Sequence, residues 1–179
     1  SLIENKDLLD EAFAMSLAQN QIKLADEIIE NIANNPYNIA LERFEWGSNS
    51  DILNQAMILC NTHRLSGEQK YLTGAVQITD YIFGKNATGY SFLTGFGSKK
   101  VMFPHHRPSG ADGITEPIPG FIVGGPNIDK QDSGQIEYAS NFPAKSYMDV
   151  EASYASNEVC LNWNAPAVYV LGYLEQVHN

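Results

Sequence analysis

Residues 147–165 read Tyr-Met-Asp-Val-Glu-Ala-Ser-Tyr-Ala-Ser-Asn-Glu-Val-Cys-Leu-Asn-Trp-Asn-Ala and place three carboxylates among aromatic rings. The acids are Asp149, Glu151 and Glu158, and the rings are Tyr147, Tyr154 and Trp163. A sugar ring can lie on an aromatic face, and cleavage of a glycosidic bond needs a carboxylic acid to protonate the leaving oxygen. Desolvation beside rings raises the pKa of a carboxyl group, which keeps it protonated for that step. The alternative is a helix start, where acids favour the positive end of the helix dipole.

The spacing in this stretch resembles the second active-site signature of glycoside hydrolase family 9, the inverting cellulases. That signature has an aromatic residue, then an aspartate, a second aromatic residue, a glutamate, and an asparagine before a small residue. One position departs, because Cys160 stands where the family usually has Ser, Thr or Ala. The matching positions are Tyr147, Asp149, Tyr154, Glu158, Asn164 and Ala165.

A long segment before this stretch is rich in glycine and proline. Residues 84–156 carry ten of the 14 glycines and six of the 8 prolines, which excludes a long regular element there. The segment is also too apolar for a solvated linker. Loops of this length inside a compact domain are usually functional when they are not disordered. We therefore expect a functional loop.

The loop contains a second group of residues that suit a sugar, ending in Pro104-His105-His106-Arg107. An arginine fork and an imidazole can hydrogen-bond sugar hydroxyls. Residues 91–107 resemble the first signature of the same family, which implies that His105 and Arg107 line the subsite next to the scissile bond. Taken alone, the loop is also compatible with a surface hydrogen-bond hub, or with a zinc site at His105 and His106.

Apolar residues at steps of three and four predict helices on both sides of the loop. The first is expected to end near Pro36, and a second is expected over about 50–63. The stripe of the first helix is Leu8, Ala12, Met15, Ala18, Ile22, Ala25, Ile29 and Ile32.

Two further helices are predicted from their ends. Ser66 and Gln69 have the spacing of a capping box, and Gly84 is a typical C-cap residue. A last helix is expected to start at Asn164, with Pro166 in its first turn.

The resemblance implies an all-α fold, a partial (α/α)6 barrel with long Gly/Pro-rich active-site loops. It implies hydrolysis of β-1,4-glucosidic bonds in cellulose or related β-glucans by inversion, of the endo-β-1,4-glucanase type. Glu158 would be the general acid, and an aspartate roughly 6.5–9.5 Å away would be the base. Asp149 would lie near the acid and hold charge or hydrogen bonds around it, while Tyr154 and Trp163 would contact substrate.

The segment that supplies the base in this family, an Asp-Ala-Gly-Asp type sequence, does not occur here. About five helical segments are predicted, where the barrel needs twelve. We therefore expect residues 1–179 to be the C-terminal portion of one catalytic domain, inactive or nearly so by itself. The expected partners are a β-1,4-glucan or cello-oligosaccharide and the N-terminal part of the same enzyme, or a second copy through self-association.

Composition excludes several classes of partner. A net charge of −10 argues against nucleic acid, and no apolar run approaches the roughly 18 residues of a membrane span. Cys60 and Cys160 have no metal-type spacing, so their state is open. No cofactor is expected, and calcium binding does not follow from any cluster of residues. A polymeric substrate implies a secreted or cell-surface enzyme.

Three alternatives compete with the cellulase hypothesis. The chain could be a non-catalytic carbohydrate-binding fragment, for which Glu158→Gln would change no assay. It could be a helical scaffold with a metal-binding loop. Within the family, it could belong to an exo-acting cellobiohydrolase or a glucosaminidase.

Overall fold

The computed structural model describes residues 2–178, with the side chains of residues 10, 11 and 13–178. No helix in this described part is long and apolar enough to cross a membrane. The helices are α1 (Leu2–Ala33), α2 (Ser48–Ser66), α3 (Gln69–Ile82), α4 (Arg107–Ala111), α5 (Tyr154–Asn157) and α6 (Leu161–His178), with a 3₁₀ turn, η1, at Pro143–Lys145.

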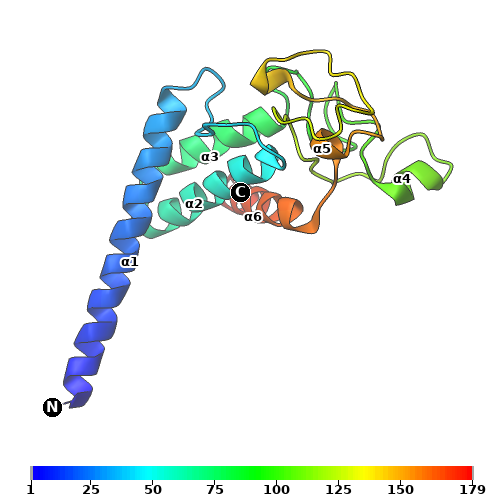
Figure 1. Ribbon diagram of the computed structural model, residues 1–179. Coiled ribbons are helices and arrows are strands. Elements are labelled where there is room, and N and C mark those ends of the chain that lie inside the picture. The colour runs from blue at the N-terminus through cyan, green and yellow to red at the C-terminus, as the bar shows by residue number, and fades with distance from the viewer. Residues whose placement is uncertain (1, 179) are drawn as a thin grey trace.

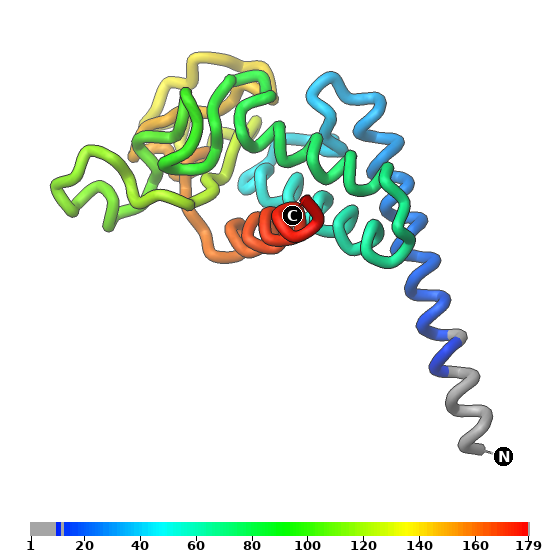
Figure 2. Tube along the Cα trace, turned by 180° about the vertical axis from the view of Figure 1, so that it is seen from behind, coloured from blue at the N-terminus to red at the C-terminus, as the bar shows by residue number. Residues whose placement is uncertain are grey.

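Helix α2 lies at the centre of the helical layer. It packs against α1, α3 and α6, and α1 also touches α3. Figures 1 and 2 show the loops of residues 84–160 gathered at one end of these helices. In Figure 1 the first half of α1 extends away from the body. The helices therefore form a platform at one side of the loops.

Helices α1, α2 and α3 approach one another closely at Gly74 of α3. A Cβ atom built there would lie 2.6 Å from Ile29 Cδ1 of α1 and 3.0 Å from Leu59 Cδ1 of α2. The absence of a side chain at this position lets three helices meet around one buried core.

The apolar stripe predicted along α1 is confirmed only in its second half. Of the predicted residues, Ala25 and Ile32 are buried and Ile29 is partly buried against the core. Ile28, which lay outside the predicted stripe, is buried as well. Met15 was predicted to be on a packed face, but its side chain is 58% exposed, because no described element covers the first half of α1. Leu8 and Ala12 of the stripe lie outside the described side chains.

Both predicted helix N-caps are wrong. Ser66 is the last residue of α2, and its hydroxyl donates to the Thr62 carbonyl, while Gly67 closes the helix with a φ of 73°. Asn164 lies inside α6, where its side chain bonds to the Ile122 backbone. In each case the side chain that the local pattern assigned to a helix cap bonds elsewhere. Ser66 bonds within the preceding helix, and Asn164 bonds to a distant loop.

The loops are joined by isolated β-bridges, and the residues described form no longer strands. Ser91 pairs with Lys100, Leu93 with Ile122, and Val123 with Val159. The start of α2 holds this layer, because the Ser48 hydroxyl donates to the Pro126 carbonyl and the Asn49 amide to the Val123 carbonyl. The expected absence of a long regular element in residues 84–156 is confirmed.

Substituting Gly74→Val should lower the free energy of unfolding by about 1–3 kcal/mol, because the core around it has no room for a branched side chain. The matched control is Gly172→Val in α6, where a Cβ meets nothing within 4 Å, and it should change stability by less than about 0.5 kcal/mol. Urea unfolding followed by circular dichroism measures both. Equal effects would contradict the close approach at Gly74.

Candidate active site

Glu158 follows the short helix α5 in extended conformation, with φ −67° and ψ 150°. Its backbone is fixed on both sides. The His105 amide donates to the Asn157 carbonyl at 2.8 Å, and the Gly124 amide donates to the Glu158 carbonyl at 2.9 Å. His105 and Glu158 form a parallel bridge. The structure thus brings together an acid and an imidazole that the sequence predicted from separate motifs.

Asn157, the residue before Glu158, is a buried hydrogen-bond hub. Its amide nitrogen donates to the Phe103 carbonyl and, at 3.2 Å, to the Asp149 carboxylate. Its amide oxygen accepts from the Tyr147 hydroxyl at 2.6 Å. These contacts leave the polypeptide little freedom immediately before Glu158.

The Asp149 carboxylate is occupied by donors from the neighbouring loop. It accepts the backbone N–H groups of Met102 at 2.9 Å and Phe103 at 3.0 Å, in addition to the Asn157 amide. A carboxylate with three such donors holds a loop in place and is poorly placed to abstract a proton. This geometry suits the supporting role expected for Asp149.

Tyr147 is buried beside this group. Its ring packs edge-on against Tyr90 and Phe92, with centroid distances of 5.3 and 5.0 Å. Burial, followed by the charge of Asp149, raises the pKa of the Tyr147 phenol well above its usual value. The phenol therefore stays protonated and remains a donor to Asn157.

A second buried carboxylate, Asp132, supports the start of α5, and sequence reasoning missed it. It accepts the Tyr138 hydroxyl at 2.7 Å, the Ser153 hydroxyl at 2.9 Å and the Ala155 N–H at 3.0 Å. Burial raises the pKa of Tyr138 to about 12. Asp132 lies in a Gly-rich loop where Asp is also a common turn residue, so its sequence context does not distinguish the two roles.

The two histidines have different surroundings. His105 Nδ1 contacts the Glu151 backbone carbonyl, which can only accept, so Nδ1 must carry the proton and Nε2 is the remaining ring nitrogen. His106 Nδ1 is 2.9 Å from the Ser109 hydroxyl, and its ring packs on Phe121 at 4.8 Å. His105 thus belongs to the site, whereas His106 supports the loop. Within the described residues, His, Cys, Asp and Glu form no group of three that could hold a metal ion.

Aromatic rings extend from His105 in a row. The Tyr154 ring lies 6.2 Å from that of His105 and 5.5 Å from that of Trp46, measured between centroids. The Tyr154 hydroxyl donates to the Gln131 carbonyl at 2.9 Å, which fixes the ring. Trp46 is 42% exposed, so it forms the outer end of the row.

Trp163 of α6 packs against backbone. A Cβ atom at Gly47 or at Gly124 would lie within 3.1 Å of its ring, so both glycines are needed for this approach. Gly47 also has a φ of 85°, which other residues rarely adopt. The contacts of Trp163 are therefore structural on this side, and substrate contact remains a prediction.

Arg107 and the carboxylate of Glu158 have no polar partner among the described residues. Arg107 begins α4 two residues after His105, and its side chain is exposed. Glu158 is half-buried. Both groups are thus available to a ligand near His105.

Comparison with known proteins gives one consistent result. The family model described as "Glycosyl hydrolase family 9" matches residues 5–171. A xyloglucan-specific endo-beta-1,4-glucanase of Bacteroides ovatus is 43% identical over 171 residues, covering 93% of this chain and 29% of the relative. Endoglucanase D of Acetivibrio thermocellus is 34% identical over 162 residues, covering 89% of this chain and 24% of the relative.

Solved structures agree. The structure titled "Bacteroides ovatus GH9" has a TM-score of 0.85 at 39% identity and covers 96% of this chain and 30% of that one. A metagenome-derived glycoside hydrolase family 9 endoglucanase has a TM-score of 0.83 at 32% identity. The match covers 91% of this chain and 29% of that one. The expected partial (α/α)6 barrel is confirmed, and this chain spans less than a third of these relatives.

Substituting Asp149→Asn should lower the free energy of unfolding by about 1–3 kcal/mol, because an amide NH₂ would face backbone donors. The amides of Met102 and Phe103 should exchange with solvent faster, as measured by hydrogen exchange. The control is Asp129→Asn, which breaks an exposed ion pair with Arg43 and should change stability by less than about 1 kcal/mol. Unchanged exchange at both amides would contradict the role of Asp149.

The buried phenol of Tyr147 predicts loss of stability at high pH. Its folded pKa lies above the usual value of 10.0, so the stabilisation is complete below that value. It is lost as pH rises further, because the unfolded chain ionises first. Tyr147→Phe should start about 1–3 kcal/mol less stable, since Asn157 loses a donor. Between about pH 9 and pH 12 the free energy of unfolding of this variant should then fall by less than that of the wild type. Unfolding measured across this range tests it, and parallel curves would contradict it.

Proposed function

Because this chain belongs to glycosyl hydrolase family 9, we propose that it forms part of an enzyme that hydrolyses β-1,4-glucosidic bonds in β-glucans. The observation that carries the proposal is the backbone pairing of His105 with Glu158. By this proposal Glu158 is the proton donor and His105, whose backbone is paired with it, binds the substrate, with the rings of Tyr154 and Trp46 nearby. We propose an inverting mechanism of the endoglucanase type.

In this mechanism Glu158 is the general acid. Its carboxyl protonates the leaving glycosidic oxygen while a water attacks from the opposite face of the sugar ring. His105 offers Nε2 to a sugar hydroxyl, because Nδ1 is taken by the Glu151 carbonyl. Arg107, two residues further on, supplies donors in a planar fork. These two residues hold the sugar at the scissile bond.

Rings beside the acid provide the apolar contact surface. Tyr154 and Trp46 continue from His105 and present ring area to a glucan chain. Trp163 is proposed to contribute from α6. A row of rings suits a linear sugar polymer, since each pyranose has an apolar face.

The catalytic base is proposed to come from outside these residues. Asp149 is engaged by three donors, so it is not available to activate water. We take residues 1–179 as the C-terminal portion of one catalytic domain, with the base supplied by an N-terminal portion. By this proposal the 179-residue chain alone does not turn over.

The helices carry exposed apolar surface that such a portion would cover. Phe13, Leu17, Leu65 and Val168 are large exposed apolar residues on α1, α2 and α6. Two adjoining cavities of about 360 and 500 Å³ share Arg64 as a wall residue. Exposed apolar area of this kind favours association, so self-association is the alternative when the N-terminal portion is missing. A polymeric substrate also implies action outside the cell or at its surface.

A hybrid protein tests the role of Glu158. The matched 171 residues of the Bacteroides ovatus relative are replaced by those of this chain, and release of reducing sugar is measured from xyloglucan, the substrate in that relative's name, and from carboxymethylcellulose. The hybrid should be active, and its Glu158→Gln variant should lose about 10²–10⁴-fold in kcat, because general acid catalysis contributes that much. The 179-residue chain alone should show no turnover.

Glu137→Gln is the matched control, since Glu137 is exposed in a loop and should leave activity unchanged. Thermal unfolding should be the same for all hybrids. A folded Glu158→Gln hybrid with full activity would contradict the assignment of the acid. Robust turnover by the isolated chain would show that the base has been misplaced.

A further inference from the structure

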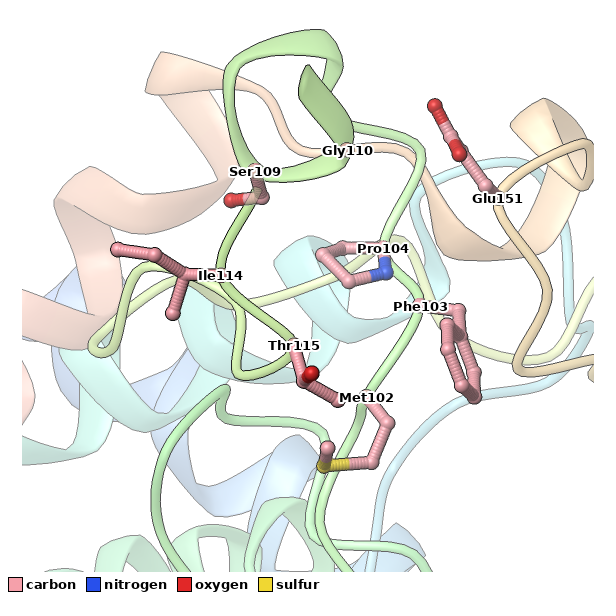
Figure 3. A pocket seen from close by; sticks show the side chains of 8 residues that line it. All are labelled: Met102, Phe103, Pro104, Ser109, Gly110, Ile114, Thr115 and Glu151. Atoms are coloured by element: carbon pink, nitrogen blue, oxygen red, sulfur yellow. The ribbon is translucent and has the colours of Figure 1, made fainter. Parts of the chain in front are cut away.

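A separate cavity lies beside the site, where three distant segments meet (Figure 3). Residues 102–104 and Glu151 form one side, and the α4 loop forms the other through Ser109, Gly110, Ile114 and Thr115. Its volume is about 260 Å³. Pockets that enclose whole ligands measure about 300–1,000 Å³, so this one has room for a single ring.

Hydrogen bonds hold each wall of this cavity in place. Asp149 fixes the backbone of Met102 and Phe103. On the opposite wall, the Ser109 hydroxyl contacts His106 and accepts from the Ile118 N–H, and Asp112 accepts from the Ile114 N–H. The cavity is therefore preformed, as binding pockets usually are.

The wall chemistry is mixed in a way that suits a sugar. The side chain of Phe103 is 54% exposed and that of Ile114 is 65% exposed, which leaves apolar area facing water. The Glu151 carboxylate and the Thr115 hydroxyl form no hydrogen bond or ion pair with any residue that the structure describes. A negative carboxylate disfavours an anion, whereas a pyranose offers an apolar face to Phe103 and hydroxyl donors to Glu151.

Gly110 determines where the Glu151 carboxylate lies. A Cβ atom at position 110 would be 2.6 Å from Glu151 Oε1, so any other residue would displace the carboxylate. Displacement is possible without unfolding, because the contact is with the end of a flexible side chain. A substitution at Gly110 can therefore shift the Glu151 carboxylate while the other residues that line the cavity stay unchanged.

The cavity is joined to the site around His105. Pro104, which lines it, is bonded directly to His105, and successive Cα atoms are about 3.8 Å apart. Glu151 contributes to both, since its carbonyl holds His105 while its carboxylate lines the cavity. A ligand lying on His105 can therefore reach the cavity with a neighbouring sugar unit.

We propose that this cavity, bounded by Phe103, Glu151 and the α4 loop, binds one additional pyranose unit of the substrate. The inference rests on the proposed glucan-hydrolase function, which sets the ligand class. A further backbone glucose and a branch sugar on the glucan present the same ring chemistry. The cavity thus acts as a specificity pocket next to the acid.

The test is binding to the 179-residue chain, measured by amide chemical shifts and calorimetry. The probes are an unbranched β-1,4-glucan oligosaccharide and one of equal backbone length with single-sugar branches. The amides of Phe103 and Thr115 should shift on binding. Phe103→Ala should weaken binding about tenfold, the usual effect of truncating a central aromatic contact. Gly110→Ala should weaken it about threefold by moving the Glu151 carboxylate.

Matched controls use the same substitutions elsewhere. Phe142→Ala removes a ring that is 74% exposed in a distant loop, and Gly134→Ala adds a Cβ where nothing lies within 4 Å. Neither should alter affinity. Weakening by Phe103→Ala with both probes supports a pocket for a backbone glucose, and weakening only with the branched probe supports a pocket for a branch sugar.

Two outcomes overturn the proposal. One is that Phe103→Ala and Gly110→Ala bind both probes as tightly as the wild type, or that neither probe binds. The other is that shifts occur at His105 and Glu158 but not at Phe103 and Thr115. The function itself is judged by the Glu158→Gln hybrid, so a failed pocket leaves that result standing, and a failed hybrid leaves the binding result standing.

Discussion

Every buried backbone N–H and C=O group must find a hydrogen-bond partner, and residues 84–160 have neither long helices nor strands to provide it. In this protein buried side chains share that task with backbone–backbone bonds between the loops. Asn157 and Asp149 hold the segment at Phe103, and Asp132 holds the start of α5. These bonds position the backbone at Glu158, because they hold the residues around it in place. The Glu158 side chain itself takes no part in them.

The contrast between Asp149 and Glu158 shows how environment separates two carboxylates of one motif. Asp149 is surrounded by donors and serves as an acceptor for the loop. Glu158 has no polar partner among the described residues and is free to meet a substrate. The same distinction divides His105, whose Nε2 is left over for a ligand, from His106, which is engaged with Ser109 and Phe121.

The helices matter to the site through a few contacts at their ends. The start of α2 is bonded to Pro126 and Val123, and Asn164 of α6 is bonded to Ile122. Glycines at 47 and 124 let Trp163 lie against the same layer. The loop geometry is thus transmitted from the helical platform through these side chains, which explains how a loop with isolated bridges can hold a defined site.

Sequence alone determined the helices and the long Gly/Pro-rich loop, because these depend on periodicity and spacing between near neighbours. That Glu158 and His105 share one site was implied by the family resemblance of their two motifs. Only the tertiary structure decided what each polar residue does. Asp149 meets donors 46 and 47 residues away, and Asn157 meets Phe103 across 54 residues. Ser66 and Asn164 were misassigned for the same reason, since their patterns are local but their partners are not. Met15 completes a local stripe, yet burial requires a second surface, and that surface is a property of the packed molecule rather than of the helix.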